Sequence, residues 1–200
     1  DALPDRFGNA VIRRYFEERG EPQRALSPVQ RLLYVGDRAM GALEFQPSLD
    51  LPRRKTEKLP LDIADLVAQS RSIIEGKSEI AVPGIMLVGA SAGGMRPKAL
   101  ILWNRERNEV RSGHAIPGPG DEHWLIKFDG VAAAGADSGT GAKGEHEPQA
   151  YMKIEYAYSV MARNAGLVLP ETRLLRERGY AHFMVRRFDR SGNARVHQHT

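Results

Sequence analysis

The sequence predicts an α+β protein in which a small helical unit precedes an antiparallel sheet with a helix packed on it. Two observations lead to this prediction. Apolar residues recur at helical spacing up to about residue 78, whereas short apolar runs divided by Gly, Asn and Pro follow from about residue 80. Helices followed by a separate run of strands are typical of the α+β class. We therefore divide the chain into a mainly helical part, 1–78, and a sheet-based part, 79–200.

The helical part contains three expected helices and one short strand. Gly20 stops the first helix, and Ser27 followed by Pro28 is an N-cap with proline at the first helical position. Asp62 and Asp65 fall in the first turn of the third helix, where the helix dipole favours acidic side chains. The expected elements are helices over 5–19, 28–34 and 60–75 and a strand over 40–45.

The sheet-based part begins with four strands that we expect to pair in sequence as a β-meander. A Gly- and Ala-rich loop follows, then a helix that ends at Gly166, and then two further strands. The expected strands cover 85–88, 99–103, 109–115, 124–128 and the surroundings of 173–175 and 183–185, with the loop over 132–144 and the helix from 147.

Composition narrows the class of protein. The net charge of +4 comes from 29 basic against 25 acidic residues without a basic tail, so nucleic-acid binding is not indicated. The chain has no cysteine, which excludes disulfides and thiolate metal sites. Its apolar runs are shorter than the ~18 residues of a membrane span, and its first residues fit no signal peptide. We expect a cytoplasmic protein with no membrane contact.

The segment 87–100 has the clearest features of a ligand-binding site. It places small residues from Gly89 to Gly94 between two apolar runs, which predicts a strand, a glycine-rich loop and a second strand. Backbone N–H groups in such a loop can approach phosphate oxygens, and Arg96 and Lys98 add positive charge. The spacing is not that of a Walker A loop. The alternative is a wide hairpin whose glycines supply positive φ angles.

A second candidate is Lys127, the one lysine in the apolar run 124–128. Buried lysines need an anionic partner. In eukaryotic-type kinases a strand lysine beyond the glycine-rich hairpin grips the nucleotide phosphates and pairs with a helix glutamate, for which Glu155 is the candidate. The alternative is that strand alternation turns Lys127 towards water and that Glu155 lies on a solvated helix face.

A third candidate is the connector 186–190, which follows an apolar strand. In a kinase lobe the hinge lies at this place. The alternative is a salt-bridged turn in which Asp189 lies between exposed arginines and adds little stability.

Six segments form an ordered set along the chain: Asp1–Gly8, Gly36–Phe45, Ser91–Ala99, Leu125–Phe128, Ala162–Leu167 and Arg187–Arg190. The set resembles the HipA kinases, which are the toxin halves of bacterial HipAB toxin–antitoxin modules. The resemblance depends on the order of the segments rather than on any single motif, and it covers essentially the whole chain. It implies that the sheet-based part is a kinase-like, ATP-binding N-lobe.

The resemblance also implies roles for individual residues. Lys127 matches the ATP-binding strand lysine, and Ser91 matches a serine whose autophosphorylation ejects the loop from the nucleotide site. A phosphate there would add about −1.5 to −2 charge and compete with ATP for the same donors. The alternative for Ser91 is a loop serine that caps a turn. The implied nucleotide-binding residues are Ala92, Gly93, Gly94, Met95, Arg96, Lys98, Lys127, Arg186 and Phe188.

The family's catalytic Asp, its Asn metal ligand and a later metal-binding Asp all follow the Arg-Phe-Asp-Arg element. This sequence ends ten residues after Arg190, and nothing in 191–200 resembles them. We therefore expect an internal fragment that contains no catalytic or metal-binding residue and does not transfer phosphate by itself. His197 and His199 lack a third ligand and do not indicate a metal site.

For the intact protein the resemblance implies a serine/threonine kinase that uses ATP and Mg²⁺ and acts as the toxin of a type II toxin–antitoxin system. It implies an aminoacyl-tRNA synthetase as the protein substrate and a HipB-like helix-turn-helix antitoxin as the partner, with DNA reached only through the antitoxin. The alternative is a catalytically inactive, kinase-derived module that binds an antitoxin or another protein.

Overall fold

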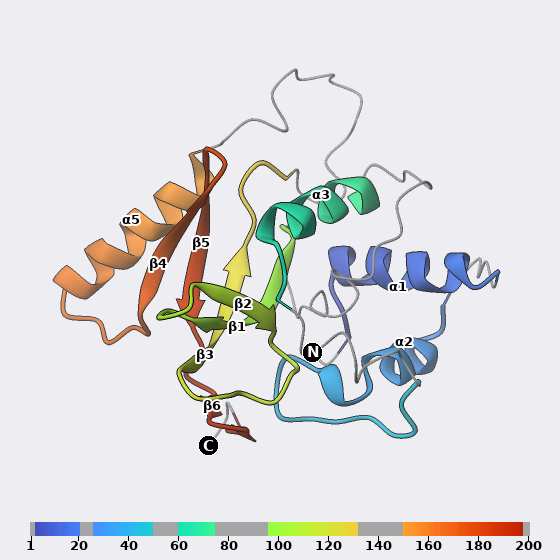
Figure 1. The fold of residues 1–200 in the computed structure, drawn as a ribbon. Coiled ribbons are helices and arrows are strands. Elements are labelled where there is room, and N and C mark those ends of the chain that lie inside the picture. Colours follow the sequence, from blue (N-terminus) through green and yellow to red (C-terminus); the bar gives the residue numbers. More distant parts are fainter. Residues whose placement is uncertain (1–2, 21–25, 50–59, 75–95, 132–149, 198–200) are drawn as a thin grey trace.

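The computed structural model describes residues 3–20, 26–49, 60–74, 96–131 and 150–197. Three helices precede the sheet, and one further helix follows its third strand (Figure 1), so the predicted α+β class is confirmed. The elements are α1 (Arg6–Glu18), α2 (Pro28–Val35), the 3-10 helix η1 (Gly36–Arg38), α3 (Ile63–Ile74), β1 (Lys98–Asn104), β2 (Glu109–Ser112), β3 (Asp121–Lys127), α5 (Tyr151–Asn164), β4 (Thr172–Glu177), β5 (Tyr180–Arg186), β6 (Arg190–Ser191) and β7 (Ala194–Arg195).

Side-chain caps fix where the first three helices start. Ser27 Oγ accepts from the Gln30 amide at 3.2 Å and Gln30 Oε1 accepts from the Ser27 amide at 2.9 Å, which is a capping box at the predicted start of α2. Asp5 Oδ1 accepts from the Gly8 amide at 2.7 Å and caps α1. Asp62 Oδ1 accepts from the Ala64 amide at 2.7 Å ahead of α3. The three predicted helices are confirmed apart from their outermost residues.

The five-stranded antiparallel sheet has the order β2-β1-β3-β5-β4. The predicted β-meander is therefore wrong, because β1 pairs with both β2 and β3 and leaves β2 at an edge. Burial explains the difference: every residue of β1 is buried, whereas β2 is short and only alternately buried. The predicted strand 85–88, and the boundary between the parts at 78 and 79, lie outside the described residues.

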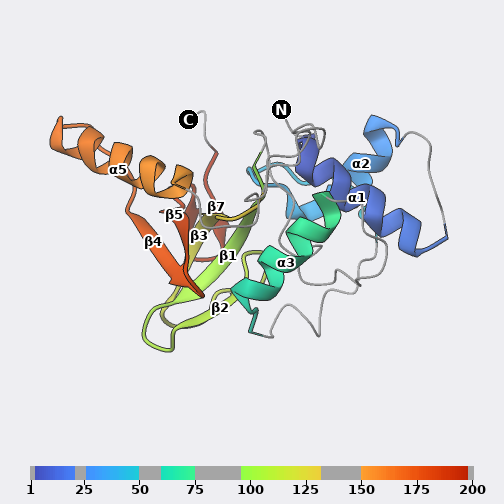
Figure 2. The ribbon, with the colours of Figure 1, turned by 90° about the horizontal axis from the view of Figure 1, so that it is seen from above.

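The two faces of the sheet are covered by different helices (Figure 2). Ile101, Trp124 and Met184 point to one face, where they join a core with α1 and α3 that includes Phe7 and Leu66. The opposite face carries α5 against β4 and β5. A smaller cluster of Ile12, Tyr15, Phe16 and Tyr34 joins α1 to α2. None of the helices in the described ranges is long and apolar enough to cross a membrane.

Residues 40–45 form no strand, which corrects the sequence prediction. Their carbonyl groups bond to arginine side chains instead of to a neighbouring strand. Arg190 Nη2 donates to the Met40 carbonyl at 2.7 Å, and Arg195 Nη1 donates to the Gly41 carbonyl at 3.4 Å. These arginines lie about 150 residues further along the chain, so the local apolar pattern could not reveal them.

Candidate functional site

The site is centred on Lys127, the last residue of β3. Its ammonium group forms an ion pair with Oε1 of Glu155 on α5. The two side chains are 26% and 36% exposed, so the pair lies at the surface of the sheet and not in its core. Phe183, directly across from Lys127 on β5, places its ring centroid 5.7 Å from the ammonium nitrogen. The structure thus brings together the two residues that sequence reasoning had paired.

Lys98 lies directly opposite Lys127 in the β1–β3 register. Two like charges in this relation repel each other unless each has a partner of its own. Lys98 Nζ is 3.4 Å from Asp5 Oδ2, and these side chains are only 7% and 4% exposed. Lys98 is therefore buried against the start of α1. Asp5 was not anticipated, although a lysine opening an apolar strand signals that an acid lies nearby.

Arg96 stacks on Tyr151, with its guanidinium carbon 4.1 Å from the ring centroid. Tyr151 is the first residue of α5 and precedes Glu155 by four positions, so the two side chains lie on one helix face. Arg96 and Lys127 consequently contact successive turns of the same helix. The other predicted loop residues, Ser91, Ala92, Gly93, Gly94 and Met95, lie outside the described residues.

The same face of α5 is tied to β4 at its far end. Ser159 Oγ is 2.7 Å from Thr172 Oγ1, and Arg163 Nη2 donates to the same oxygen at 2.7 Å. Arg163 Nη1 also donates to the Pro170 carbonyl at 3.3 Å. Ser159 and Arg163 therefore face β4, and their contacts hold the helix that carries Glu155 in place.

An apolar shelf adjoins Lys127 on the same face of the sheet. Leu125 is two residues before Lys127, and side chains two apart in a strand share a face. Leu125 pairs with Leu100 on one side and with Val185 on the other. Leu125 and Val185 are only partly buried. The shelf can therefore pack against a flat apolar group while Lys127 binds an anion next to it.

The connector after β5 does not bring its predicted ligand residues to Lys127. Arg186 pairs with Trp124, so its side chain points to the opposite sheet face, where its Nη2 is 3.4 Å from Glu122 Oε1. Phe188 lies beyond the strand and is 68% exposed. The Arg186 amide donates to the Glu171 carbonyl at 2.8 Å.

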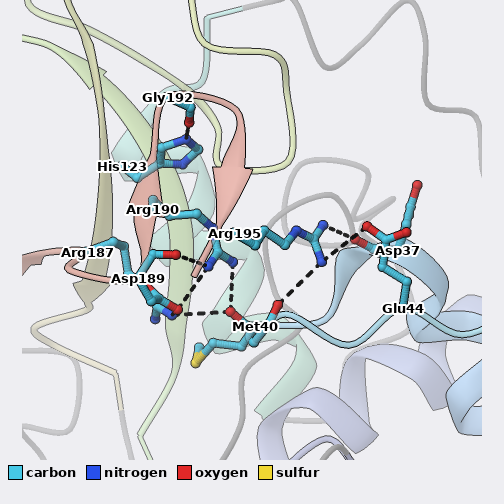
Figure 3. Close-up of polar contacts among 10 residues, drawn as sticks. Asp37, Met40, Glu44, His123, Arg187, Asp189, Arg190, Gly192 and Arg195 are labelled. Atoms are coloured by element: carbon cyan, nitrogen blue, oxygen red, sulfur yellow. Dashed lines mark hydrogen bonds and ion pairs between the residues drawn. The ribbon is translucent and has the colours of Figure 1, made fainter. Parts of the chain in front are cut away.

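Asp189, two residues later, is fully buried. Its carboxylate accepts from Arg187 Nε at 2.7 Å and from Arg190 Nη1 at 2.9 Å, and both arginines also donate to the Met40 carbonyl (Figure 3). The alternative interpretation of this motif, a turn with exposed arginines, is wrong, because both arginine side chains are less than a tenth exposed. The hydrogen bonds of Arg187 and Arg190 to Met40 link the connector to residues 37–44.

His123 lies beside this cluster on β3. Its Nε2 is 3.1 Å from the Gly192 carbonyl, to which it donates (Figure 3). Burial and the positive charges of Arg190 and Arg187 lower the pKa of His123, so the imidazole is neutral at pH 7. The hydrogen bond joins β3 to the hairpin of β6 and β7, two strands that sequence reasoning missed because each has only two residues.

Comparison with known protein families shows to which family the chain belongs. A family model described as the HipA-like C-terminal domain matches residues 90–200, which is more than half of the chain. The chain belongs to the HipA-like family. The match covers β1 to β7 and α5, and therefore Arg96, Lys127 and Glu155. No curated protein and no solved structure gives a significant match.

Proposed function

We propose that this HipA-like chain binds ATP through the site around Lys127, as the nucleotide-binding lobe of a protein serine/threonine kinase. The observation that supports the proposal best is the ion pair between Lys127 and Glu155, which joins a strand lysine to a helix glutamate beside an apolar shelf. Such a pair orients an ammonium group towards nucleotide phosphates in kinase lobes. The pair's partial exposure leaves the ammonium accessible to a ligand.

The described residues fit the parts of a nucleotide. Lys127 and Arg96 supply positive charge for the phosphates, and charge-assisted hydrogen bonds to phosphate are the strong ones. The partly buried side chains of Leu125 and Val185 can contact one face of a purine ring. In the described part of the chain no group of three or more His, Cys, Asp or Glu side chains gathers to hold a metal ion. Mg²⁺ therefore enters the proposal as the counter-ion that ATP brings with it.

Lys127→Ala tests the proposal by isothermal titration with Mg-ATP. Loss of one charged hydrogen bond costs about 1.5–3 kcal/mol, so we expect the dissociation constant to rise about tenfold to a hundredfold. Lys153→Ala is the matched control, because it removes the same charge from an exposed position on α5. Equal affinities for the wild type and both variants would show that ATP does not bind at Lys127.

We propose further that the intact protein phosphorylates a serine of a protein substrate and modifies its own Ser91. The support is the family membership together with the ordered sequence motifs. Mass spectrometry after incubation of the full-length protein with Mg-ATP tests this, with Lys127→Ala as the control. Phosphate on Ser91 in the wild type alone is the expected result, and unmodified protein in both samples contradicts it.

A second candidate function, protein binding without catalysis, is favoured by exposed apolar side chains on α5 and just after it. Tyr158 and Met161 are each more than 60% exposed, and Val168 just beyond the helix is almost fully exposed. Exposed apolar side chains grouped in this way mark interaction surfaces. An antitoxin with a helix-turn-helix domain and an aminoacyl-tRNA synthetase remain the predicted partner and substrate. Both predictions rest on the resemblance.

A further inference from the structure

The proposed function gives no role to Tyr151, the residue that contacts Arg96. The guanidinium carbon lies 4.1 Å from the ring centroid, well within the range of a cation–π interaction. Tyr151 is 55% exposed, so the ring is available to a surface side chain and is not part of the core. The guanidinium group of Arg96, a side chain with many rotamers, is thereby held over a ring that belongs to α5.

The register places Arg96 close to Lys127. Arg96 is two residues before Lys98, the direct partner of Lys127, and the Phe128 amide donates to the Pro97 carbonyl at 3.3 Å. Strand pairing therefore continues to the residue next to Arg96. On the helix side, Tyr151 is one turn, about 6 Å along the axis, from Glu155. Arg96 and Lys127 thus contact the same face of α5 at positions one helical turn apart.

We propose that Tyr151 is a positioning residue that holds the Arg96 guanidinium beside Lys127, so that both cations engage the phosphates of one polyphosphate ligand. The inference rests on the proposed function, and it adds a residue that touches no ligand itself. Without the ring, Arg96 would have to give up its rotamer freedom when the ligand binds, and that loss would weaken binding.

Tyr151→Leu tests this inference with three probes: Mg-ATP, inorganic tripolyphosphate and adenosine. The stabilisation typical of an exposed cation–π contact corresponds to an increase of about twofold to fivefold in the dissociation constant. We expect this increase for ATP and tripolyphosphate and no change for adenosine, which has no phosphate. Tyr151→Phe keeps a ring and should bind like the wild type. Tyr158→Leu, which alters another exposed tyrosine on α5, should also leave all three affinities unchanged.

A purely structural role for Tyr151 predicts a different pattern. If Tyr151→Leu weakens adenosine as much as ATP, or if Tyr151→Phe is as defective as Tyr151→Leu, the positioning role is refuted. The positioning role is also refuted if Tyr151→Leu raises the dissociation constant for ATP as much in an Arg96→Gln background as in the wild type. If the wild type binds ATP no more tightly than tripolyphosphate, the proposed nucleotide function fails while a Tyr151-dependent polyphosphate site stands. If the wild type binds neither ligand, both proposals fail.

Discussion

Replacement of Asp189 by Asn should destabilise the protein more than any surface substitution. The carboxylate is fully buried between Arg187 and Arg190, whose side chains are 9% and 8% exposed. Asn keeps the size of the side chain but removes the negative charge, which leaves two buried guanidinium groups without a counter-ion. Removal of one partner of a buried ion pair costs about 3–5 kcal/mol. With a urea m-value of about 2–3 kcal/mol/M, the midpoint should fall by about 1–2.5 M.

Urea unfolding of Asp189→Asn and of Arg186→Gln provides the comparison. Arg186 is a neighbouring arginine that is 51% exposed and forms a surface ion pair with Glu122, for which the expected cost is at most about 1 kcal/mol. If both variants lose the same small amount of stability, the Asp189 cluster is not the buried ion network that its geometry indicates. A large loss in Asp189→Asn alone supports it.

Two further predictions concern His182, whose Nδ1 accepts from the Asp129 amide at 3.0 Å, and Gly130, the next residue after Asp129. Burial lowers the pKa of His182 from 6.5 to about 4. Between these pH values the unfolded state therefore binds a proton more readily than the folded state. The free energy of unfolding should fall by up to about 3 kcal/mol as the pH drops from about 6.5 to about 4. Thermal unfolding at several pH values should show this slope in the wild type and not in His182→Phe, and an unchanged slope would contradict it. Gly130 has a φ of +67°, and an added Cβ would lie 2.3 Å from Tyr180. Gly130→Ala should therefore cost about 1–3 kcal/mol in unfolding free energy, whereas Gly179→Ala, with positive φ but open space, should cost less.

The sequence predicted correctly those features of the fold that depend on interactions between residues close together in the chain. The start of α2 follows from Ser27 and Pro28, because the cap and the proline act on the first turn alone. The strands of the sheet were found for the same reason, since each is a short apolar run between turns. The order of the strands was not found, because the pairing of β1 with β3 rather than with β2 alone depends on burial over the whole sheet.

Non-local partners account for the rest of what sequence reasoning missed. Nothing near Lys98 shows that Asp5, 93 residues away, is its ion-pair partner. The alternative of an exposed, salt-bridged turn around Asp189 followed from its charged neighbours in sequence, which do not reveal that Arg187 also donates to the distant Met40 carbonyl. The pairing of Lys127 with Glu155 was anticipated because the resemblance supplied a spatial relation that spacing alone does not contain.

The arginine contacts around residues 37–44 have a consequence for synthesis on the ribosome. The carbonyls of Asp37, Met40 and Gly41 receive their hydrogen bonds from Arg187, Arg190 and Arg195. Chains are made from the N-terminus at about 5–20 residues per second, so this early segment waits roughly 10–30 s for its partners. A nascent chain arrested before Arg187 should be cut by protease within 37–44, and one that has fully exposed Arg195 should resist. Residues made about 150 positions later thus complete the fold of this segment.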